Sequence, residues 1–264
     1  MKKTIKYSAM AVIAAACLYF FPKISIFYLA CGLYDVGRNR PIDGFLLKQY
    51  FTGNGVTTWL LSPINILLDL ITLPYINKGV YQLTDLPAPY QEEIKRLIAV
   101  AKQENLVGQL EARAKELDRT MIFFKWYGEN VNTFLRTPAF HERWKYVETI
   151  GVSIFNKRVS TSKHFGPLRP TLRLLFNLND IEDRSAYIVV GDKVNYWQDN
   201  KLFIFDDTLM HQSFNETDKV RYCLFVDIVR PSLLTGLLRP AVSLVNQIFR
   251  SANHIFYKKW KVIQ

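Results

Sequence analysis

Few side chains in this sequence are suited to binding a metal ion or acting as a nucleophile. The four histidines, to which any histidine-based metal site is limited, are His141, His164, His211 and His254. The three cysteines, too few and too scattered for a disulfide framework or a zinc ribbon, are Cys17, Cys31 and Cys223. The sequence contains no glycine-rich phosphate loop, no Gly-x-Ser-x-Gly elbow and no Cys-x-x-Cys pair. The usual nucleotide-binding, hydrolase and zinc-finger classes are therefore excluded.

Short β-rich runs recur from Thr149 onward, separated by turn signals such as Phe165-Gly166-Pro167 and Gly191-Asp192. The runs cover residues 152–155, 172–176, 187–190, 202–205 and 222–226. Many short strands at this spacing predict a β-sandwich or jelly roll. The candidate site residues lie within and between these runs.

Five segments of this region occur in an order seen in one known family. They are Lys163-His164-Phe165-Gly166-Pro167, Leu172-Arg173-Leu174-Leu175, Phe205-Asp206-Asp207-Thr208-Leu209-Met210-His211, Val220-Arg221 and Asp227-Ile228-Val229-Arg230-Pro231. Together they resemble the aspartyl/asparaginyl β-hydroxylases, which are iron(II) and 2-oxoglutarate dioxygenases. Ser62-Pro63-Ile64-Asn65 and Phe124-Lys125-Trp126-Tyr127-Gly128 are similar to the membrane-bound lipid A 2-hydroxylase branch.

The resemblance implies a mainly β fold, a cupin-like jelly roll (double-stranded β-helix), with Fe(II) and 2-oxoglutarate as cofactors. His211 matches the second metal-binding histidine, and Arg221 matches the arginine that binds the distal carboxylate of 2-oxoglutarate. A guanidinium suits this task because it grips a carboxylate through two charge-assisted hydrogen bonds. Arg173 and Asp207 are expected to support the site. We also expect His211 and Arg221 to lie on adjacent strands, pointing into the mouth of the barrel.

The position of the first metal-binding histidine is occupied by Leu175, which cannot bind a metal ion. Three hypotheses follow. His164 serves as a substitute ligand, or iron is held weakly by His211 and 2-oxoglutarate, or the domain does not bind metal productively. His211 and Arg221 also have a purely structural interpretation, in which His211 bonds Asp207 and Arg221 pairs with Asp206 or Asp227.

The first residues of the chain combine lysines with a long apolar run. Lys2, Lys3 and Lys6 precede the mostly uncharged stretch from Tyr7 to Tyr34, which is long enough for a membrane-spanning helix. An uncleaved anchor, a cleaved signal peptide and a buried helix of a soluble domain all remain open. A second apolar stretch, residues 56–76, contains polar residues and two prolines and is expected to be a re-entrant or interfacial helix.

Two further helices are expected beside the strands. The pattern from Pro89 to about Asp118 predicts one amphipathic surface helix. Near the C-terminus, one apolar stripe consists of Leu238, Val242, Val245, Phe249, Ala252, Phe256 and Trp260. Basic residues accompany this stripe, so an interfacial helix on an anionic membrane is one interpretation. A helix packed on the protein's own core is the other.

Composition constrains the partners of this chain. It has 264 residues and a formal net charge of +11, with 49% hydrophobic and 14% aromatic residues, which excludes disordered-tail and collagen-like classes. The positive charge favours a phosphate-bearing partner. Nucleic acid is disfavoured because the basic residues cluster beside apolar stripes rather than across an aromatic-decorated sheet.

We therefore expect three segments: a membrane-associated region 1–84, a hydroxylase-like domain 85–231, and a basic amphipathic helix 232–264. Two function classes remain open. One is a dioxygenase that hydroxylates the acyl chain of lipid A or another lipid. The other is an impaired pseudo-hydroxylase that binds lipid or a protein partner at the membrane. The expected location is the cytoplasmic face of the inner membrane, where 2-oxoglutarate and reduced iron are plentiful and cysteines stay reduced.

Overall fold

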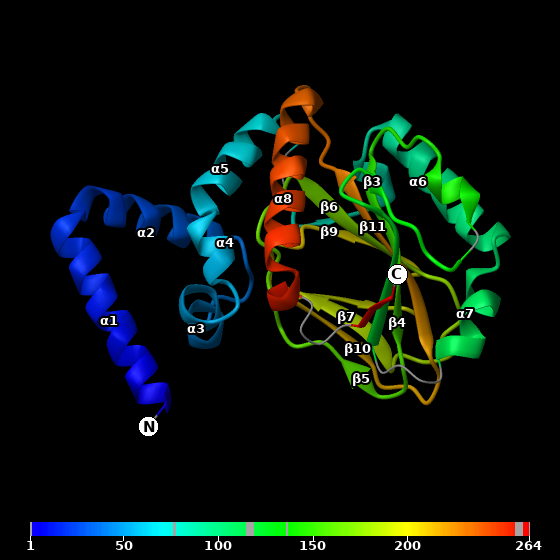
Figure 1. Ribbon diagram of the computed structural model, residues 1–264, viewed down its shortest axis with the longest axis horizontal. Helices are drawn as coiled ribbons and strands as arrows, with labels where there is room; N and C mark the ends of the chain where they lie inside the picture. Colours follow the sequence, from blue (N-terminus) through cyan, green and yellow to red (C-terminus); the bar gives the residue numbers. More distant parts are fainter. Residues whose placement is uncertain (1, 76–77, 115–118, 136, 257–260, 264) are drawn as a thin grey trace.

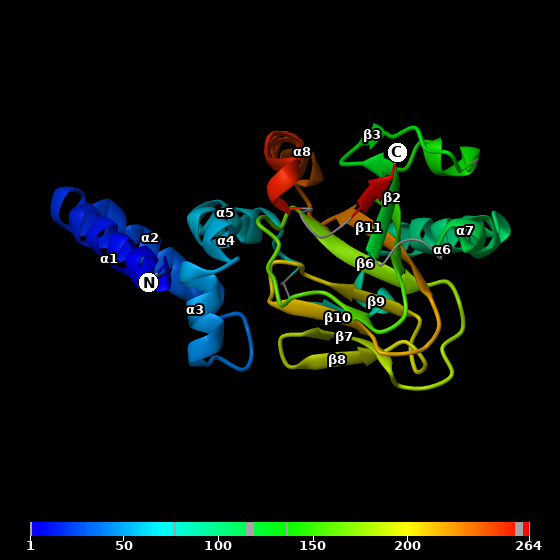
Figure 2. The ribbon, with the colours of Figure 1, turned by 60° about the horizontal axis from the view of Figure 1, so that its bottom comes forward.

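Two β-sheets face each other at the centre of the molecule, with helices around them (Figure 1). The computed structural model describes residues 2–75, 78–114, 119–135, 137–256 and 261–263. In the larger sheet the strand order is β1-β9-β6-β11-β4-β2-β12, with β3 paired to β2. In the smaller sheet the order is β5-β10-β7-β8, and Figure 2 shows this sheet as a separate layer. All strand pairs are antiparallel except β12 with β2.

The strands of the larger sheet are β1 (Val80–Tyr81), β2 (Arg119–Trp126), β3 (Glu129–Asn130), β4 (Val147–Phe155), β6 (Thr171–Asn177), β9 (Leu202–Phe205), β11 (Arg221–Val229) and β12 (Lys261–Ile263). Those of the smaller sheet are β5 (Val159–Ser160), β7 (Ala186–Val190), β8 (Lys193–Tyr196) and β10 (His211–Asn215). Each of the five predicted β-rich runs lies within a strand, and the predicted mainly β class is confirmed. The remaining strands, β2 and β8 among them, lie outside the predicted runs.

The larger sheet is buried on both faces, which explains the nearly continuous apolar sequence of its central strands. Side chains alternate between faces along a strand. Leu172, Leu174 and Phe176 of β6 therefore join one core with helices α6 and α7. Leu175, between them in sequence, joins the second core, which lies between the two sheets.

Helices α6 (Ala88–Gln103) and α7 (Leu106–Ala114) cover the outer face of the larger sheet (Figure 1). The single helix predicted from Pro89 to about Asp118 is therefore two helices within the described residues. The break lies at Asn105, whose φ of 46° is left-handed. Asparagine tolerates this conformation better than most residues, which makes it a suitable point to end one helix and start another.

The N-terminal region contains α1 (Lys2–Phe20), α2 (Pro22–Val36), α3 (Gly44–Thr52), α4 (Val56–Leu60) and α5 (Ser62–Ile71). A single helix from Tyr7 to Tyr34 is not observed, because Pro22 starts a new helix after Phe21. Proline favours the first helical turn, where its missing N–H is not needed. Among the described helices, none is both long and apolar enough to cross a bilayer.

Helix α8 (Thr235–Phe256) packs beside α5 (Figure 1). The first three residues of its predicted stripe, Leu238, Val242 and Val245, are buried against Leu168 and Val229 of the β-domain. Burying each such aliphatic side chain contributes roughly 1.5–3 kcal/mol. This half of the stripe packs on the protein's own core, which corrects the interpretation of the whole stripe as interfacial. The later side chains lie outside the described residues.

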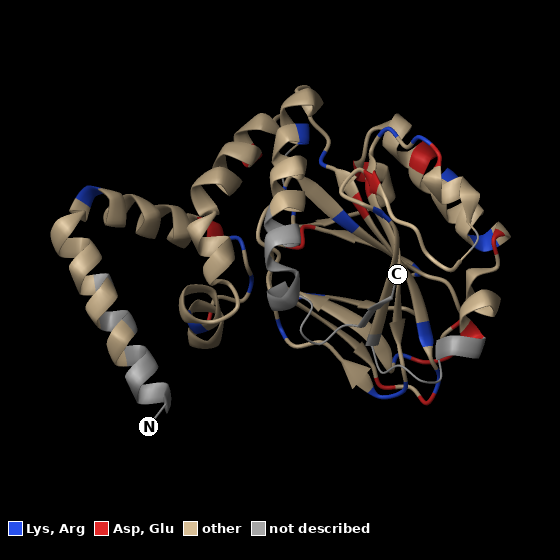
Figure 3. Ribbon diagram, in the orientation of Figure 1, with Lys and Arg blue, Asp and Glu red and all other residues tan. Residues whose placement is uncertain are grey.

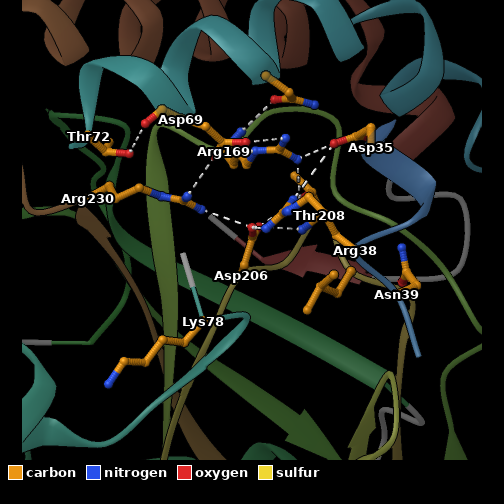
Figure 4. A network of polar contacts seen from close by, with 12 residues as sticks. Asp35, Arg38, Asn39, Asp69, Thr72, Lys78, Arg169, Asp206, Thr208 and Arg230 are labelled. Carbon is orange, nitrogen blue, oxygen red and sulfur yellow. Dashed lines mark hydrogen bonds and ion pairs between the residues drawn. The ribbon is translucent and has the colours of Figure 1, made fainter. Parts of the chain in front are cut away.

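A buried ionic network ties α2 and α5 to the β-domain (Figure 4). Arg169, in the loop before β6, forms ion pairs with Asp35 of α2 and, at 2.7 Å, with Asp69 of α5. Arg230, just after β11, lies 3.3 Å from Asp69 and 3.0 Å from Asp206. The expected N-terminal segment is thus joined to the hydroxylase-like segment through buried charges.

The charges of this network balance each other. Asp206 also pairs with Arg38, which follows α2. Burial alone would raise the pKa of Asp206, but Arg38, Arg230 and Arg169 hold it below its ordinary value. Removing one partner from such a network leaves an uncompensated buried charge, which is strongly destabilising. The network therefore fixes the helices to the sheets.

Candidate active site

A cavity of about 160 Å³ lies between the two sheets. Its lining includes all five residues that the sequence nominated: His164, Arg173, Asp207, His211 and Arg221. The structure thus brings together side chains that are up to 57 positions apart in the chain. Their chemical roles stay predictions.

The alternation of side chains along the strands places these groups in the cavity. Arg173 and Leu175 of β6 point into it, and so do Arg221 and Phe225 of β11. Leu174 of β6 and Tyr222 and Leu224 of β11 point to the opposite face of the larger sheet, because side chains in a strand alternate with a period of two. A slip of one residue in either strand would replace the site's polar groups with leucine and valine.

His211 and Arg221 come from different sheets, so the expectation that they lie on adjacent strands is wrong. His211 begins β10 of the smaller sheet, and Arg221 begins β11 of the larger one. The two strands meet across the cavity, where Arg221 Nη2 donates a hydrogen bond of 3.0 Å to Ser213 Oγ of β10. The sequence predicted the residues but not the sheet that each belongs to.

His211 is buried and held in one tautomer. Its Nδ1 lies 2.8 Å from the carbonyl oxygen of Leu209. A carbonyl oxygen only accepts, so Nδ1 carries the proton and Nε2 is the basic nitrogen. Burial, reinforced by the neighbouring His164, holds the pKa of His211 well below its ordinary value. His211 is therefore neutral at pH 7, and the structural alternative in which it bonds Asp207 is not observed.

His164 lies directly beside His211. Their backbones form a β-bridge, with each N–H donating to the other's carbonyl oxygen at 3.0 and 2.9 Å. The centroids of the two imidazole rings are 4.1 Å apart. The Nδ1 of His164 lies 2.7 Å from the carbonyl oxygen of Ser162, which repeats the arrangement seen at His211. Two imidazoles with the same tautomer thus lie side by side at the cavity.

Arg221 is 1% exposed, and two of its nitrogens, Nε and Nη1, have no hydrogen-bond partner. None of the ion pairs in the described part of the chain includes Arg221. Burial lowers its pKa, partly offset by the Cys223 thiol. The structural interpretation, pairing with Asp206 or Asp227, is wrong. A buried guanidinium without a counter-ion is costly, which indicates a place for an anion.

Arg173 links two carboxylates at the side of the cavity. It lies 3.2 Å from Asp207 and 2.9 Å from Asp227, and its guanidinium carbon is 4.1 Å from the ring centroid of Phe225. Burial raises the pKa of Asp207 to about 7, against the opposing effect of Arg173. These contacts position Phe225 and Asp207, and the supporting role of Arg173 and Asp207 stays a prediction.

Leu175 points into the same cavity as His211, at the position where the resemblance places a histidine. It pairs with Phe225 and Phe203 of the neighbouring strands, so its surroundings are apolar. Asn177, two residues after Leu175 at the end of β6, does not line the cavity, and its side-chain amide donates to the carbonyl oxygen of Asn179 at 2.6 Å. Among the described residues, no three His, Cys, Asp or Glu side chains gather as a metal site.

The loop that carries His164 is held by polar residues of the helices. Thr58 of α4 donates to the carbonyl oxygen of Gly166 at 2.9 Å. Asn65 of α5 donates to the carbonyl oxygen of Pro167 at 3.2 Å and accepts from the Arg169 N–H at 3.1 Å. These residues stand in a sequence stretch that is otherwise apolar. They were not predicted as site residues, although a polar residue at helical spacing in an apolar stretch is a usable signal.

Other lining residues were missed as well, among them Ser213 and Ile188. Ser213 follows His211 by two positions, so the period of two would have placed it on the cavity face. Ile188 of β7 lies on the floor of the same cavity. Both belong to the smaller sheet, whose position opposite the larger one cannot be inferred from local patterns.

Several known proteins are similar to this chain. A family model described as Aspartyl/Asparaginyl beta-hydroxylase matches residues 91–231, which is just over half of the chain. The chain belongs to this family. The matched region includes both sheets' cavity-lining strands and every nominated site residue. Membership confirms the resemblance found in the sequence.

The chain is similar to the ornithine lipid ester-linked acyl 2-hydroxylase of Rhizobium tropici, with 35% identity over 104 residues. The match covers 39% of this chain and 37% of the relative, so it spans little more than a third of that protein's length. Among solved structures, a 2OG-Fe(II) oxygenase family oxidoreductase from Burkholderia pseudomallei is similar, with a TM-score of 0.32 and 14% identity over 47% of this chain and 78% of that one. A cupin superfamily protein from Desulfitobacterium hafniense has a TM-score of 0.25 and 14% identity, covering 33% and 71%.

Proposed function

We propose that this protein is a hydroxylase that inserts oxygen into an acyl chain of a membrane lipid, with Fe(II) and 2-oxoglutarate as cofactors. The observation that carries the proposal is Arg221, a buried cation without a counter-ion that lines the same cavity as two histidines whose Nδ1 atoms each contact a backbone carbonyl oxygen. Membership of the β-hydroxylase family and the lipid acyl hydroxylase relative support the reaction type.

The chemistry of Arg221 fits the distal carboxylate of 2-oxoglutarate. Its Nε and Nη1 atoms are unpaired, and a carboxylate would accept from both. Ser213 holds Nη2, which fixes the plane of the guanidinium before the ligand arrives. Trp197 and Phe155 lie near the guanidinium, 5.2 and 4.2 Å from their ring centroids. These rings exclude water and strengthen the attraction for an anion.

The two histidines fit a divalent metal ion. Each donates its Nδ1 proton to a backbone carbonyl, which is the arrangement that orients a metal-binding imidazole. An iron ion bound there with 2-oxoglutarate would supply the activation of O₂ that acyl hydroxylation requires.

The remaining lining supplies an apolar surface for the acyl chain. Phe165, Leu175, Ile188, Phe205 and Phe225 line the cavity. Apolar side chains exclude water and bind a hydrocarbon by burial of its surface. Arg173 holds Phe225 by a contact with its ring face and is itself fixed by Asp207 and Asp227.

The substrate class is inferred from the apolar lining of the cavity and from the name of the relative. The relative's name specifies an ester-linked acyl chain of ornithine lipid, hydroxylated at carbon 2. The sequence resemblance suggested lipid A. Both are lipids with an acyl carbonyl next to the carbon that is oxidised, and an acyl chain is the part that they share. We therefore propose a lipid acyl chain as the substrate.

The distribution of charge supports a membrane partner. Residues 1–84 and 232–264 together contain 13 of the 34 Lys and Arg, but only 3 of the 23 Asp and Glu. Residues 85–231 are thus almost neutral, and nearly all of the positive excess lies in the two flanking segments of the sequence. Figure 3 shows that α1 and α2 project from the β-domain and that the part of these helices drawn in colour carries few charged residues. Basic residues beside apolar surface match an anionic bilayer.

An ordinary surface helix turns its apolar residues toward the protein and its polar residues outward. Helices α4 and α5 do the reverse. Their polar residues Thr58, Asn65 and Asp69 face the protein and bind the loop of residues 166–169. Their outward side chains include Leu60, Leu67 and Leu70, which are 54–61% exposed, and Leu73, just after the end of α5, is 53% exposed. Exposed apolar residues that gather in this way mark a contact surface. We propose that this surface rests on the cytoplasmic face of the inner membrane, where the free cysteines stay reduced.

Vesicle sedimentation tests the membrane contact. The full chain, transferred from detergent, should bind vesicles that contain anionic lipid more strongly than neutral ones. Replacing Leu60 and Leu67 by Ser should weaken binding to both kinds of vesicle. Replacing Thr58, whose side chain faces the protein, by Val should not weaken it. Equal binding of the Leu-to-Ser variant and the unmodified chain would contradict this contact.

Mass spectrometry of lipids tests the reaction. Membranes incubated with the purified chain, Fe(II) and 2-oxoglutarate should yield acyl chains heavier by one oxygen atom, with the hydroxyl on carbon 2. Arg221→Met and His211→Ala should abolish the product. A product that is unchanged in Arg221→Met would refute the proposed role of the cavity.

A second candidate function rests on Leu175. Because an aliphatic side chain occupies a position that points at the metal site, the domain is alternatively a pseudo-hydroxylase that binds an anion at Arg221 and serves as a lipid- or protein-binding module. It predicts that an anion such as 2-oxoglutarate binds at Arg221 but that no oxidised lipid is formed. The same lipid assay separates the two functions.

A further inference from the structure

We infer that His164 replaces the ligand missing at position 175, so that the metal ion is held by the adjacent pair His164 and His211. This inference rests on the proposed function, because it names the residues that bind its metal. It differs from the family resemblance, which places the first ligand on β6 and not on the loop before it.

The backbone brings the two histidines together. The mutual hydrogen bonds of 3.0 and 2.9 Å between their main chains fix the residues opposite each other. Side chains of directly opposed residues in an antiparallel bridge lie on the same side. Both rings consequently point to the cavity that contains Arg221.

Both rings are also oriented in the same way. Each places Nδ1 within 2.8 Å of a carbonyl oxygen two residues earlier in the chain, Ser162 for His164 and Leu209 for His211. Each therefore presents Nε2 as its basic nitrogen. Two imidazoles that independently adopt this arrangement are explained by a shared metal ion more simply than by packing.

The loop that carries His164 is rigid enough to position a ligand. Gly166, two residues later, donates to the Asp207 carbonyl oxygen at 2.7 Å and accepts from Thr58. A Cβ at Gly166 would lie 2.5 Å from the Asp207 carboxylate, so the two chains are in close contact. The ionic pairs of Arg169 hold the other end of the loop.

The other polar residues nearby have different tasks. Asp207 pairs with Arg173 at 3.2 Å, and Arg173 also pairs with Asp227. Arg221 carries the wrong charge for a metal ligand. The histidine pair is thus the part of the described cavity lining that places two imidazole nitrogens side by side as metal ligands. The oxygen atoms of 2-oxoglutarate would supply further ligands.

An anaerobic Fe(II) titration of the full chain in detergent, with saturating 2-oxoglutarate, tests the inference. Binding is followed by the visible charge-transfer band and by calorimetry. We expect His164→Ala to weaken Fe(II) binding at least about tenfold, since even outer partners of metal ligands contribute 10- to 100-fold. His141→Ala, on a short helix outside the cavity (η2, Pro138–His141), is the matched control and should bind as the unmodified chain does.

A double variant provides the rescue. Leu175→His in the His164→Ala background should restore Fe(II) binding, because position 175 points into the same cavity. Unfolding midpoints of all variants show whether each one folds. Should His164→Ala not fold, pulsed electron paramagnetic resonance of the unmodified chain with Cu(II) as the probe counts the bound imidazoles directly. Two coordinated imidazoles support the inference, and one overturns it.

The outcomes separate this inference from the proposed function. Fe(II) binding that is equal in His164→Ala and the unmodified chain overturns the inference, while oxidised lipid in the assay above would keep the proposed function. No Fe(II) binding by the unmodified chain, but binding by Leu175→His alone, overturns both and supports the pseudo-hydroxylase.

Discussion

Two buried arginines of this protein have opposite surroundings. The side chain of Arg169 is 0% exposed and pairs with Asp35 and Asp69. Arg221 is 1% exposed and has no carboxylate partner among the described ion pairs, with two of its nitrogens unpaired. The first belongs to the network between the helices and sheets, and the second lines the cavity.

The difference distinguishes a charge that serves folding from one that serves a ligand. A structural buried charge carries its counter-ions with it, because an unpaired one costs several kcal/mol. Arg221 bears this cost in the free protein, and binding of an anion would relieve it. The same substitution at the two positions should therefore have opposite effects on stability.

Arg169→Met should have the largest effect. It leaves Asp35 and Asp69 without their main counter-ion, and breaking a buried pair in this way costs about 3–5 kcal/mol. The free energy of unfolding, measured by urea denaturation in detergent, should fall by this amount. A loss below about 1 kcal/mol would mean that the network does not hold the helices to the sheets.

Arg221→Met should stabilise the protein in the absence of ligand. The substitution keeps a long side chain but removes a buried charge with unsatisfied donors, whose penalty is about 1–3 kcal/mol per group. Loss of the hydrogen bond to Ser213 offsets part of this gain, so we expect the free energy of unfolding to rise by about 1–2 kcal/mol. A fall comparable to that of Arg169→Met would show that Arg221 has a hidden structural partner.

Thr58→Val should have a smaller effect. It removes one buried hydrogen bond, to the carbonyl oxygen of Gly166, and keeps the shape of the side chain. We expect a loss of about 1 kcal/mol in the free energy of unfolding, together with weaker Fe(II) binding because the bond anchors the His164 loop. The neighbouring Thr57→Val is the control, and equal effects of the two would argue against a specific role of Thr58.

Arg158→Ala should have the smallest effect and completes the comparison. Arg158 pairs with Asp218 at 2.9 Å, but both side chains are more than 70% exposed. An ion pair in water gains little, since solvent screens it. The thermal unfolding midpoint should not change measurably. A clear decrease in the midpoint would show that an ion pair stabilises the protein even when it is exposed, so that burial does not decide the cost of breaking it.

Much of the cavity could be predicted from the sequence. Alternation along β6 determines that Arg173 and Leu175 share a face, and the family motif identified His211, Asp207 and Arg221. These features are local, because side chains two positions apart in a strand point to the same side. The mainly β class followed from the same runs.

The contacts across long separations could not be predicted. Nothing local indicates that Asp35 pairs with Arg169, or that β10 lies opposite β11 rather than beside it. The partners of His211 and Arg221 were misassigned for this reason, since Asp206 and Asp207 are near in sequence but are taken up by other arginines. The break at Pro22 had a local signal that the apolar composition obscured.

Calorimetric titration of 2-oxoglutarate into the metal-free full chain tests the central claim most directly. The account predicts saturable binding to the unmodified chain and to Arg158→Ala, and a loss of affinity of about 100-fold or more in Arg221→Met, as expected when two hydrogen bonds to a charged group are lost. Affinity that is the same in Arg221→Met and the unmodified chain would contradict it.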